Sequence, residues 1–382
     1  MNIYKSFGLQ EFIINYLIID VFCIKNMKKK QINPKKNQTD YNNELDSLID
    51  EELEINNPEN EKEGPKIINI SLKKGFEQRY TEMLGDEGFA CFKEFSSKYI
   101  KKSIRINTLK ISIQEIKKRL EKNWELEQVP WCKEGFWIKY KHGKRYDIGN
   151  LPEHQLGYIY VQDAASMIPS VVLNPKPGEL VLDMCAAPGS KSSQIAQYMN
   201  NEGLLIANDA QGTRLSALGI NLQRCGVHNA LITKMEGHKI NLEEQFDKIL
   251  VDAPCSGTGT MRRNYKIIEM WSPNLIKKMA GIQFQLLSSA FKLLKETGIL
   301  VYSTCTQEPE ENELVVNRLL ENFPEAEIQE INLDIKRSPA ITEWEGKMMK
   351  KSIANCLRIY PQDNDTEGFF VAKIKKLNKK NK

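Results

Sequence analysis

From residue 180 to residue 374, short apolar runs alternate with longer segments in which apolar residues recur at helical spacing. The runs fall at residues 180–182, 204–207, 230–232, 246–250, 298–305 and 368–374, and the helical segments at residues 191–199, 214–225, 275–295 and 311–322. Strands that alternate with helices are typical of a doubly wound sheet. The sequence therefore predicts an α/β fold with a doubly wound, mostly parallel sheet over residues 151–376. Residues 160–167 are expected to start a helix ahead of the first strand.

Two of these apolar runs are followed by a cysteine. One run leads through Asp252 into the turn that contains Cys255, and the other ends in Cys305. In open α/β sheets, ligands bind beyond the carboxyl ends of the strands, so we expect both thiols in one crevice. The alternative for either cysteine alone is a small buried apolar side chain.

Composition restricts the class of protein further. The chain has 382 residues, enough for more than one domain, and a net charge of +4 from 54 basic and 50 acidic residues. This charge does not require a nucleic-acid partner, but it permits one where lysines cluster. Eight cysteines in a chain of this length do not form a disulfide scaffold. They also lack the paired C-x-x-C spacing of a structural zinc site. We expect a cytoplasmic protein with reduced thiols and no metal.

Residues 1–64 are expected to form an extension. Residues 12–24 are strongly apolar, but they are too few for a comfortable membrane span and include Asp20. They fit an upstream extension with Met27 as an alternative start, a packed extra helix, or a membrane anchor; we expect no stable membrane association. Residues 28–64 are charged and poor in large apolar side chains, which predicts a disordered linker. Residues 377–382 form a basic tail.

Residues 65–150 predict a small α+β domain. Residues 76–99 have helical apolar spacing, and residues 101–110 alternate like a strand. Ser112, with Glu115 three residues later, is a plausible N-cap for a further helix. Aromatic residues lie among the basic ones at Trp131, Trp137, Tyr140 and Tyr146. This mixture suits RNA binding by phosphate contact and base stacking, and the alternative is a solvated charged face over an ordinary core.

The loop between the first strand and its helix is a candidate cofactor site. It consists of Cys185, Ala186, Ala187, Pro188, Gly189, Ser190 and Lys191. Small residues let a ligand approach the backbone. The loop has neither the G-x-G-x-x-G pattern of dinucleotide sites nor the G-x-x-x-x-G-K spacing of phosphate loops, so we expect a nucleoside without a triphosphate.

Acids follow the next two strands. Asp209 ends the second strand, where a carboxylate can accept hydrogen bonds from ribose hydroxyls. As a helix N-cap it would instead bond the backbone amides that follow it. Glu236 follows the third strand and could reach an adenine amino group, or it could be a solvated loop acid.

Three motifs together resemble the Nop/Sun family of RNA cytosine-5 methyltransferases. They are Asp183-x-Cys-Ala-Ala-Pro-Gly-x-Lys191, Asp252-Ala-Pro-Cys-Ser-Gly257, and Tyr302-Ser-Thr-Cys305 followed by Glu310-Glu311-Asn312-Glu313. The resemblance covers residues 104–374. It includes the stretch Arg105-x-Asn107-Thr108 of the family's RNA-binding module and the closing residues 368–372. The compact form is most similar to archaeal tRNA cytosine-5 methyltransferases.

The resemblance implies a Rossmann-like domain that uses S-adenosyl-L-methionine as methyl donor, and an RNA substrate, tRNA by preference or rRNA. It implies that residues 185–191 cradle the cofactor, with Asp209 on the ribose. Arg214 matches an arginine that lies close to this acid. Glu236 stands where the family usually has Asp, followed by the same glycine, so the exchange keeps the acid but lengthens the arm.

Position 5 of cytosine is too weak a nucleophile to take a methyl group directly. A thiolate that adds at position 6 activates position 5; a base then removes the position-5 proton, and the thiolate leaves. Spacing alone does not say which thiol attacks. The resemblance assigns the attack to Cys305 and the release of the product to Cys255. It places Asp252 between base and cofactor, where the carboxyl group polarises or donates to the N3 edge if its pKa is raised.

The sequence leaves two rival functions. A methyltransferase that acts on a protein or a small molecule needs no covalent nucleophile, so the paired thiols argue against it. A non-catalytic RNA-binding or ribosome-assembly factor does not need Cys305, Cys255 and Asp252 together. The sequence gives neither the target nucleotide nor the oligomeric state.

Overall fold

The computed structural model describes residues 72–242 and 245–378. The expected extension, residues 1–64, lies outside the described residues, and so do residues 379–382 of the expected basic tail. Within the described part, no helix combines the length and the apolar character that crossing a membrane requires.

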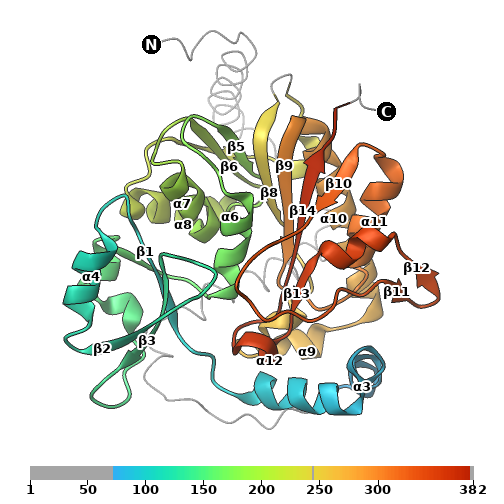
Figure 1. Ribbon diagram of the computed structural model, residues 1–382, viewed down its shortest axis with the longest axis horizontal. Coiled ribbons are helices and arrows are strands. Elements are labelled where there is room, and N and C mark those ends of the chain that lie inside the picture. The colour runs from blue at the N-terminus through green and yellow to red at the C-terminus, as the bar shows by residue number, and fades with distance from the viewer. Residues whose placement is uncertain (1–71, 243–244, 379–382) are drawn as a thin grey trace, which may run out of the picture. The chain divides into compact units, whose positions relative to one another are not determined.

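An eight-stranded sheet, here called the central sheet, carries most of the second half of the chain (Figure 1). Its strand order is β10-β14-β9-β8-β5-β6-β7, with β13 paired to β14. The strands are β5 (Leu180–Asp183), β6 (Leu204–Asp209), β7 (Ala230–Lys234), β8 (Phe246–Asp252), β9 (Leu294–Thr304), β10 (Ala326–Gln329), β13 (Leu357–Ile359) and β14 (Phe369–Lys376). Strands β5 to β9 pair in parallel, and β14 is antiparallel to its three neighbours. The predicted doubly wound, mostly parallel fold is confirmed.

Helices connect these strands (Figure 1). They are α6 (Ile168–Leu173), α7 (Ser190–Tyr198), α8 (Gly212–Cys225), α9 (Lys266–Met270), α10 (Pro273–Leu293), α11 (Glu313–Asn322) and α12 (Pro361–Asn364). The strands are apolar because both of their faces are buried. One fully buried core cluster contains Val181 of β5, Leu205 of β6, Leu250 of β8 and Val301 of β9.

A separate four-stranded antiparallel sheet, here called the small sheet, precedes the central sheet. Its order is β2-β3-β1-β4, with β1 (Ser103–Ile106), β2 (Trp124–Gln128), β3 (Gly135–Tyr140) and β4 (Ile159–Val161). Helix α4 (Ile113–Leu120) packs on it and has the capping box predicted at Ser112 and Glu115.

Residues 160–167, where the sequence predicted the start of a helix, begin instead with strand β4. The prediction was wrong for the first residues, because residues 159–161 pair with β1 and complete the small sheet; a 3-10 helix over Ala165–Met167 then leads into helix α6 at Ile168. The small sheet therefore extends past residue 150, the boundary expected from the sequence.

Helix α3 (Lys74–Ser97) is kinked at Gly85, whose φ is 71°. Its aromatic side chains pack away from the small sheet. Phe76 lies edge-on to Trp271, with ring centroids 5.4 Å apart, and Phe92 lies edge-on to Tyr360 at 6.3 Å. The helix thus packs on residues that come after the carboxyl ends of strands β8 and β13.

Arg105 and Asn107 of the expected RNA-binding module are buried and connect the small sheet to the helices of the central sheet. The Arg105 guanidinium donates to Gln197 Oε1 at 2.8 Å and to Ser193 Oγ at 2.7 Å, both on α7. Asn107 Nδ2 donates to the carbonyl oxygen of Cys225 at 2.8 Å. Both side chains hold the two sheets together and are closed off from an RNA ligand.

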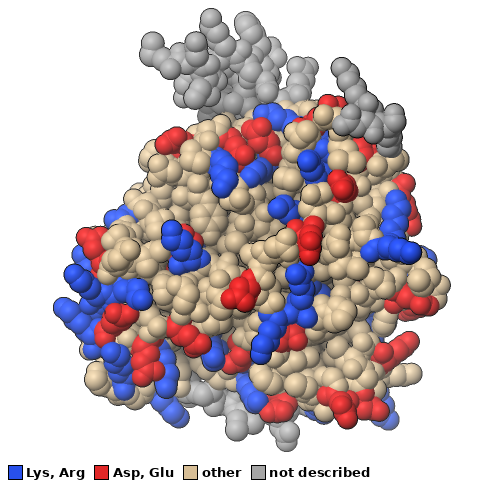
Figure 2. Space-filling model, in the orientation of Figure 1, with Lys and Arg blue, Asp and Glu red and all other residues tan. Residues whose placement is uncertain are grey.

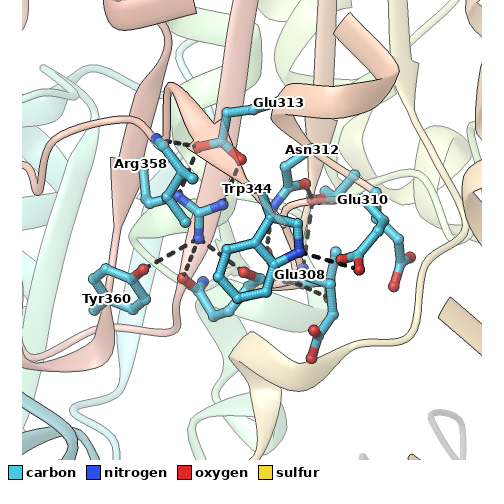
Figure 3. Close-up of polar contacts among 12 residues, drawn as sticks. Glu308, Glu310, Asn312, Glu313, Trp344, Arg358 and Tyr360 are labelled. Carbon is cyan, nitrogen blue, oxygen red and sulfur yellow. Dashed lines mark hydrogen bonds and ion pairs between the residues drawn. The ribbon is translucent and has the colours of Figure 1, made fainter. Parts of the chain in front are cut away.

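Glu313 and Arg358 form an ion pair with no exposed side-chain surface, shown in Figure 3. The guanidinium donates to the two carboxylate oxygens at 2.8 and 2.6 Å, and it also donates to the carbonyl oxygen of Gln307 at 2.9 Å. The pair joins β13, the start of α11 and the segment that follows Cys305.

We expect Arg358→Met to lower the free energy of unfolding by about 3–5 kcal/mol, because it leaves the Glu313 carboxylate buried without its cation. Urea titration measures this loss. Arg145→Met is the control: Arg145 is exposed and pairs with Asp147 at 2.7 Å, so its loss should cost less than about 1 kcal/mol. Equal losses in the two variants would contradict the expectation.

Candidate active site

Cys255 and Cys305 lie side by side at the carboxyl edge of the central sheet. Their Sγ atoms are 3.3 Å apart, and both residues are partly exposed. Strands β8 and β9 are adjacent and parallel, with Asp252 opposite Ser303, so the two strands end at the same level. The structure thus brings together the two thiols that the sequence placed in one crevice.

Hydrogen bonds hold the two cysteine turns against each other. The Gly259 amide donates to the Cys305 carbonyl oxygen at 2.8 Å, and the Thr306 hydroxyl bonds the hydroxyls of Ser256 and Thr258 at 2.8 and 2.9 Å. A Cβ atom at Gly259 would lie 2.6 Å from the Cys305 carbonyl oxygen. Only glycine permits this approach, so the turn keeps Cys255 close to Cys305.

Asp252 forms an ion pair with Lys191 beside the thiols. The Lys191 Nζ atom is 2.7 Å from Asp252 Oδ2 and donates to Ser166 Oγ at 2.9 Å, and Ser303 Oγ donates to Asp252 Oδ1 at 2.7 Å. Burial lowers the pKa of Lys191, but the neighbouring Asp252 carboxylate outweighs burial and the pKa is raised overall. Lys191 is therefore a cation next to the two sulfurs. The pairing with Asp252 was not anticipated, since 61 residues separate the two in the chain.

The candidate cofactor loop lies between β5 and α7 and is braced by Asp209 and Arg214. Asp209 Oδ2 accepts from the Ala187 amide at 3.2 Å, and Arg214 donates to the Ala187 carbonyl oxygen at 2.6 Å. Asp209 Oδ1 accepts from the amide of Gln211, the N-cap residue of α8. Asp209 thus accepts from a backbone amide that follows it, as expected for a residue near the start of a helix. It also accepts from an amide of the candidate cofactor loop.

Asp183, at the end of β5, is the buried acid of this loop. Ser192 Oγ donates to Asp183 Oδ2 at 2.7 Å, whereas Oδ1 has no hydrogen-bond partner among the described residues. Burial raises the pKa of Asp183 to about 7, and the carboxylates of Asp252 and Asp209 add to the rise. Three acids around one loop, with an acceptor left open, fit a cationic ligand; S-adenosyl-L-methionine carries an ammonium and a sulfonium group.

Two further residues predicted to bind the cofactor, Cys185 and Glu236, differ in burial. Burial, with Asp209 and Asp183 nearby, raises the pKa of the Cys185 thiol well above its ordinary value, so Cys185 stays protonated and is a poor nucleophile. Glu236 follows a residue that lies near the start of the loop, since Asn208 Nδ2 donates to the carbonyl oxygens of both Met184 and Met235. Its carboxylate is half-exposed and pairs with Lys239 at 2.9 Å.

Two family models match this chain. The model described as 16S rRNA methyltransferase RsmB/F matches residues 170–375, and the N-terminal domain of 16S rRNA methyltransferase RsmF matches residues 72–164. The chain belongs to the RsmB/F family. The resemblance to the Nop/Sun family is confirmed, and with it the prediction of an S-adenosyl-L-methionine-dependent RNA methyltransferase.

Two relatives show how far the similarity extends. The chain is 46% identical over 309 residues to the tRNA (cytosine(49)-C(5))-methyltransferase of Pyrococcus abyssi, covering 80% of this chain and 96% of that protein. It is 44% identical over 294 residues to ribosomal RNA small subunit methyltransferase F of Vibrio atlanticus, covering 75% of this chain and 60% of that protein. The chain thus spans nearly all of the archaeal relative and about three fifths of the bacterial one.

Solved structures agree with this family. A methyltransferase homologue from Pyrococcus horikoshii superposes with a TM-score of 0.72 at 41% identity, covering 80% of this chain and 95% of that one. NSun6 from the same organism, solved with SFG, superposes with a TM-score of 0.69 at 26% identity, covering 80% of this chain and 98% of that one.

Proposed function

We propose that this protein methylates position 5 of cytosine in RNA through a covalent cysteine–cytosine intermediate, in the cytoplasm, with tRNA as the preferred substrate and rRNA as the alternative. The observation that carries this proposal is the pair of thiols 3.3 Å apart beside the Lys191–Asp252 ion pair. The preference for tRNA is supported by the relative named as a tRNA methyltransferase, which aligns over 96% of its length.

In the proposed reaction, the Cys305 thiolate adds to position 6 of the target cytosine. The Lys191 ammonium stabilises thiolate character and the negative charge that develops on the ring, and Asp252 holds that ammonium in place. When bound, S-adenosyl-L-methionine supplies the electrophilic methyl group that position 5 takes up. Cys255 lies close enough to Cys305 to act on the same adduct: it takes the position-5 proton, the bond between Cys305 Sγ and position 6 then breaks, and the methylated base is released.

The RNA would approach over basic side chains of the small sheet and of helix α4, a region at the lower-left edge of Figure 2 where they lie among acidic side chains. Those exposed to solvent include Lys118, Arg119, Lys122, Lys133, Lys139, Lys141, Lys144 and Arg145. Phosphate contacts need no more than this charge. Trp131 is buried and its Nε1 donates to the Ala164 carbonyl oxygen, whereas Trp137, Tyr140 and Tyr146 are partly exposed and are the candidates for base stacking.

Residues 185–191, Asp209, Arg214, Glu236 and Asp252 are the proposed cofactor ligands. Asp209→Ala should weaken binding of S-adenosylhomocysteine by about 10–100-fold, because it removes charge-assisted hydrogen bonds. Isothermal titration calorimetry measures this. Glu125→Ala is the matched control and should change the affinity by less than about twofold, since this exposed carboxylate lies on strand β2 of the small sheet and pairs with Lys139. The reverse order of effects would exclude Asp209 as a ligand.

Bisulfite sequencing of RNA from cells with and without the gene tests the substrate. We expect one or a few tRNA cytosines to lose methylation when the gene is deleted. Loss confined to the 16S rRNA would favour the alternative substrate. If 5-methylcytosine stays unchanged in both tRNA and 16S rRNA, the proposed activity is wrong, and the protein is better explained as an RNA-binding assembly factor.

A further inference from the structure

Glu311 is a buried acid behind the Cys255 turn that the proposed reaction does not use. Its carboxyl oxygen Oε2 accepts from the Ser256 amide at 3.0 Å and from Gln283 Nε2 at 2.8 Å. Gln283, on helix α10, also donates to the carbonyl oxygen of Pro254 at 2.9 Å. Glu311 and Gln283 together therefore hold the residues immediately before and after Cys255.

The position of Glu311 is itself fixed by the strand that leads to Cys305. The Tyr302 hydroxyl donates to the Glu311 carbonyl oxygen at 2.5 Å, and Tyr302 lies on β9 three residues before Cys305. A displacement of Glu311 would thus move the Cys255 turn relative to β9. The acid is the link that sets one cysteine against the other.

The next residue, Asn312, holds the other cysteine. Asn312 Oδ1 accepts from the Thr304 hydroxyl at 2.6 Å, and Asn312 Nδ2 donates to the Thr306 carbonyl oxygen at 2.9 Å. Figure 3 shows Asn312 within the polar network that follows Cys305. Two consecutive residues therefore bracket the two cysteines separately: Glu311 brackets Cys255, and Asn312 brackets Cys305.

Glu311 has the surroundings of a neutral carboxylic acid. It is fully buried, and its second oxygen, Oε1, lacks a hydrogen-bond partner among the described residues, as does Gln283 Oε1. A proton on the acid would supply a donor among these unpaired acceptors. Burial raises the pKa of Glu311 to about 8, and the nearby Glu308 acts in the same direction.

We propose that Glu311, as a neutral acid, is a positioning residue for Cys255: it holds the Cys255 turn so that this thiol reaches the adduct on Cys305, and it controls product release rather than attack. The inference rests on the proposed assignment of release to Cys255. A loosened Cys255 turn should leave the attack intact, because the Asn312 contacts that flank Cys305 are unchanged.

The test measures multiple-turnover methylation and denaturant-resistant protein–RNA adduct, using the full chain and total tRNA from cells that lack the gene. Glu311→Ala should slow turnover at least about tenfold while adduct accumulates, because a small misplacement of a reacting group is costly. Glu311→Gln should stay within about threefold of the unaltered protein, because the amide is neutral, has the same shape and keeps an oxygen that accepts from the Ser256 amide and Gln283 Nε2. Asn312→Ala is the matched control and should lose turnover without accumulating adduct.

If Glu311→Ala accumulates no adduct, like Asn312→Ala, Glu311 only supports the local structure and the proposal is overturned. If Glu311→Gln behaves like Glu311→Ala, the claim that Glu311 acts as a neutral carboxylic acid is wrong. Should Glu311→Ala fail to fold in a thermal melt, Gln283→Met, which removes the donor to Pro254 and Glu311, carries the same expectation of accumulated adduct. Cys255→Ala distinguishes a failure of the release role proposed for Cys255 from a failure of the positioning role proposed for Glu311. If it forms no adduct, the assignment of Cys255 fails as well; if it does and Glu311→Ala does not, only the present proposal fails.

Discussion

Replacing Cys305 by alanine should abolish RNA methylation, by at least about 10⁴-fold, because it removes the thiol proposed to add to position 6 of the base. No covalent protein–RNA adduct should form. Transfer of a radiolabelled methyl group and denaturing gel electrophoresis measure the two outcomes. The chain should remain folded, since Cys305 is a small, partly exposed side chain at a strand end.

Two controls make a loss of activity in Cys305→Ala interpretable. Binding of S-adenosylhomocysteine should stay within about twofold of the unaltered protein, because the proposed cofactor ligands are untouched. Cys91→Ala, a partly exposed cysteine on helix α3, should methylate RNA normally. Residual methylation or adduct in Cys305→Ala would show that another residue attacks.

Replacing Cys255 by alanine should have the opposite signature. The attack by Cys305 remains possible, but the adduct cannot be resolved, so protein bound to RNA should accumulate to a large share of the total. We expect turnover to fall by about 10²–10³-fold, a typical range for loss of an acid–base partner. Single-turnover and multiple-turnover methylation, measured side by side, separate the two steps. If Cys255→Ala turns over normally, Cys255 has no part in release.

The central sheet could be predicted from sequence because its strands are buried on both faces and therefore appear as uninterrupted apolar runs. The short strands near residues 326–329 and 357–359 could not. They hold few residues, include charged side chains such as Glu327 and Arg358, and exist only because they pair with β14, which is distant in the chain. Strand β4 was mistaken for a helix for the same reason, since its pairing with β1 joins residues more than 50 positions apart.

The candidate site was predictable where it follows from strand ends, and unpredictable where it follows from tertiary contacts. Cys255 and Cys305 come together because adjacent parallel strands end level with each other. The Lys191–Asp252 pair and the Glu311–Gln283 contact join residues from separate elements, which no local pattern reports. One signal was present: four acids between residues 308 and 313 are too many for a segment that follows a buried strand, unless their partners are buried with them.

Peptide mapping of a trapped adduct tests the proposed chemistry most directly. The unaltered protein is incubated with S-adenosyl-L-methionine and RNA that contains 5-fluorocytosine. Its fluorine takes the place of the position-5 proton and cannot be removed by a base, so release is blocked. Trypsin cuts after lysine and arginine, and it therefore places Cys305 on residues 296–318 and Cys255 on residues 249–262. We expect the nucleotide remnant on residues 296–318. A remnant on residues 249–262, or the absence of any adduct, would contradict attack by Cys305.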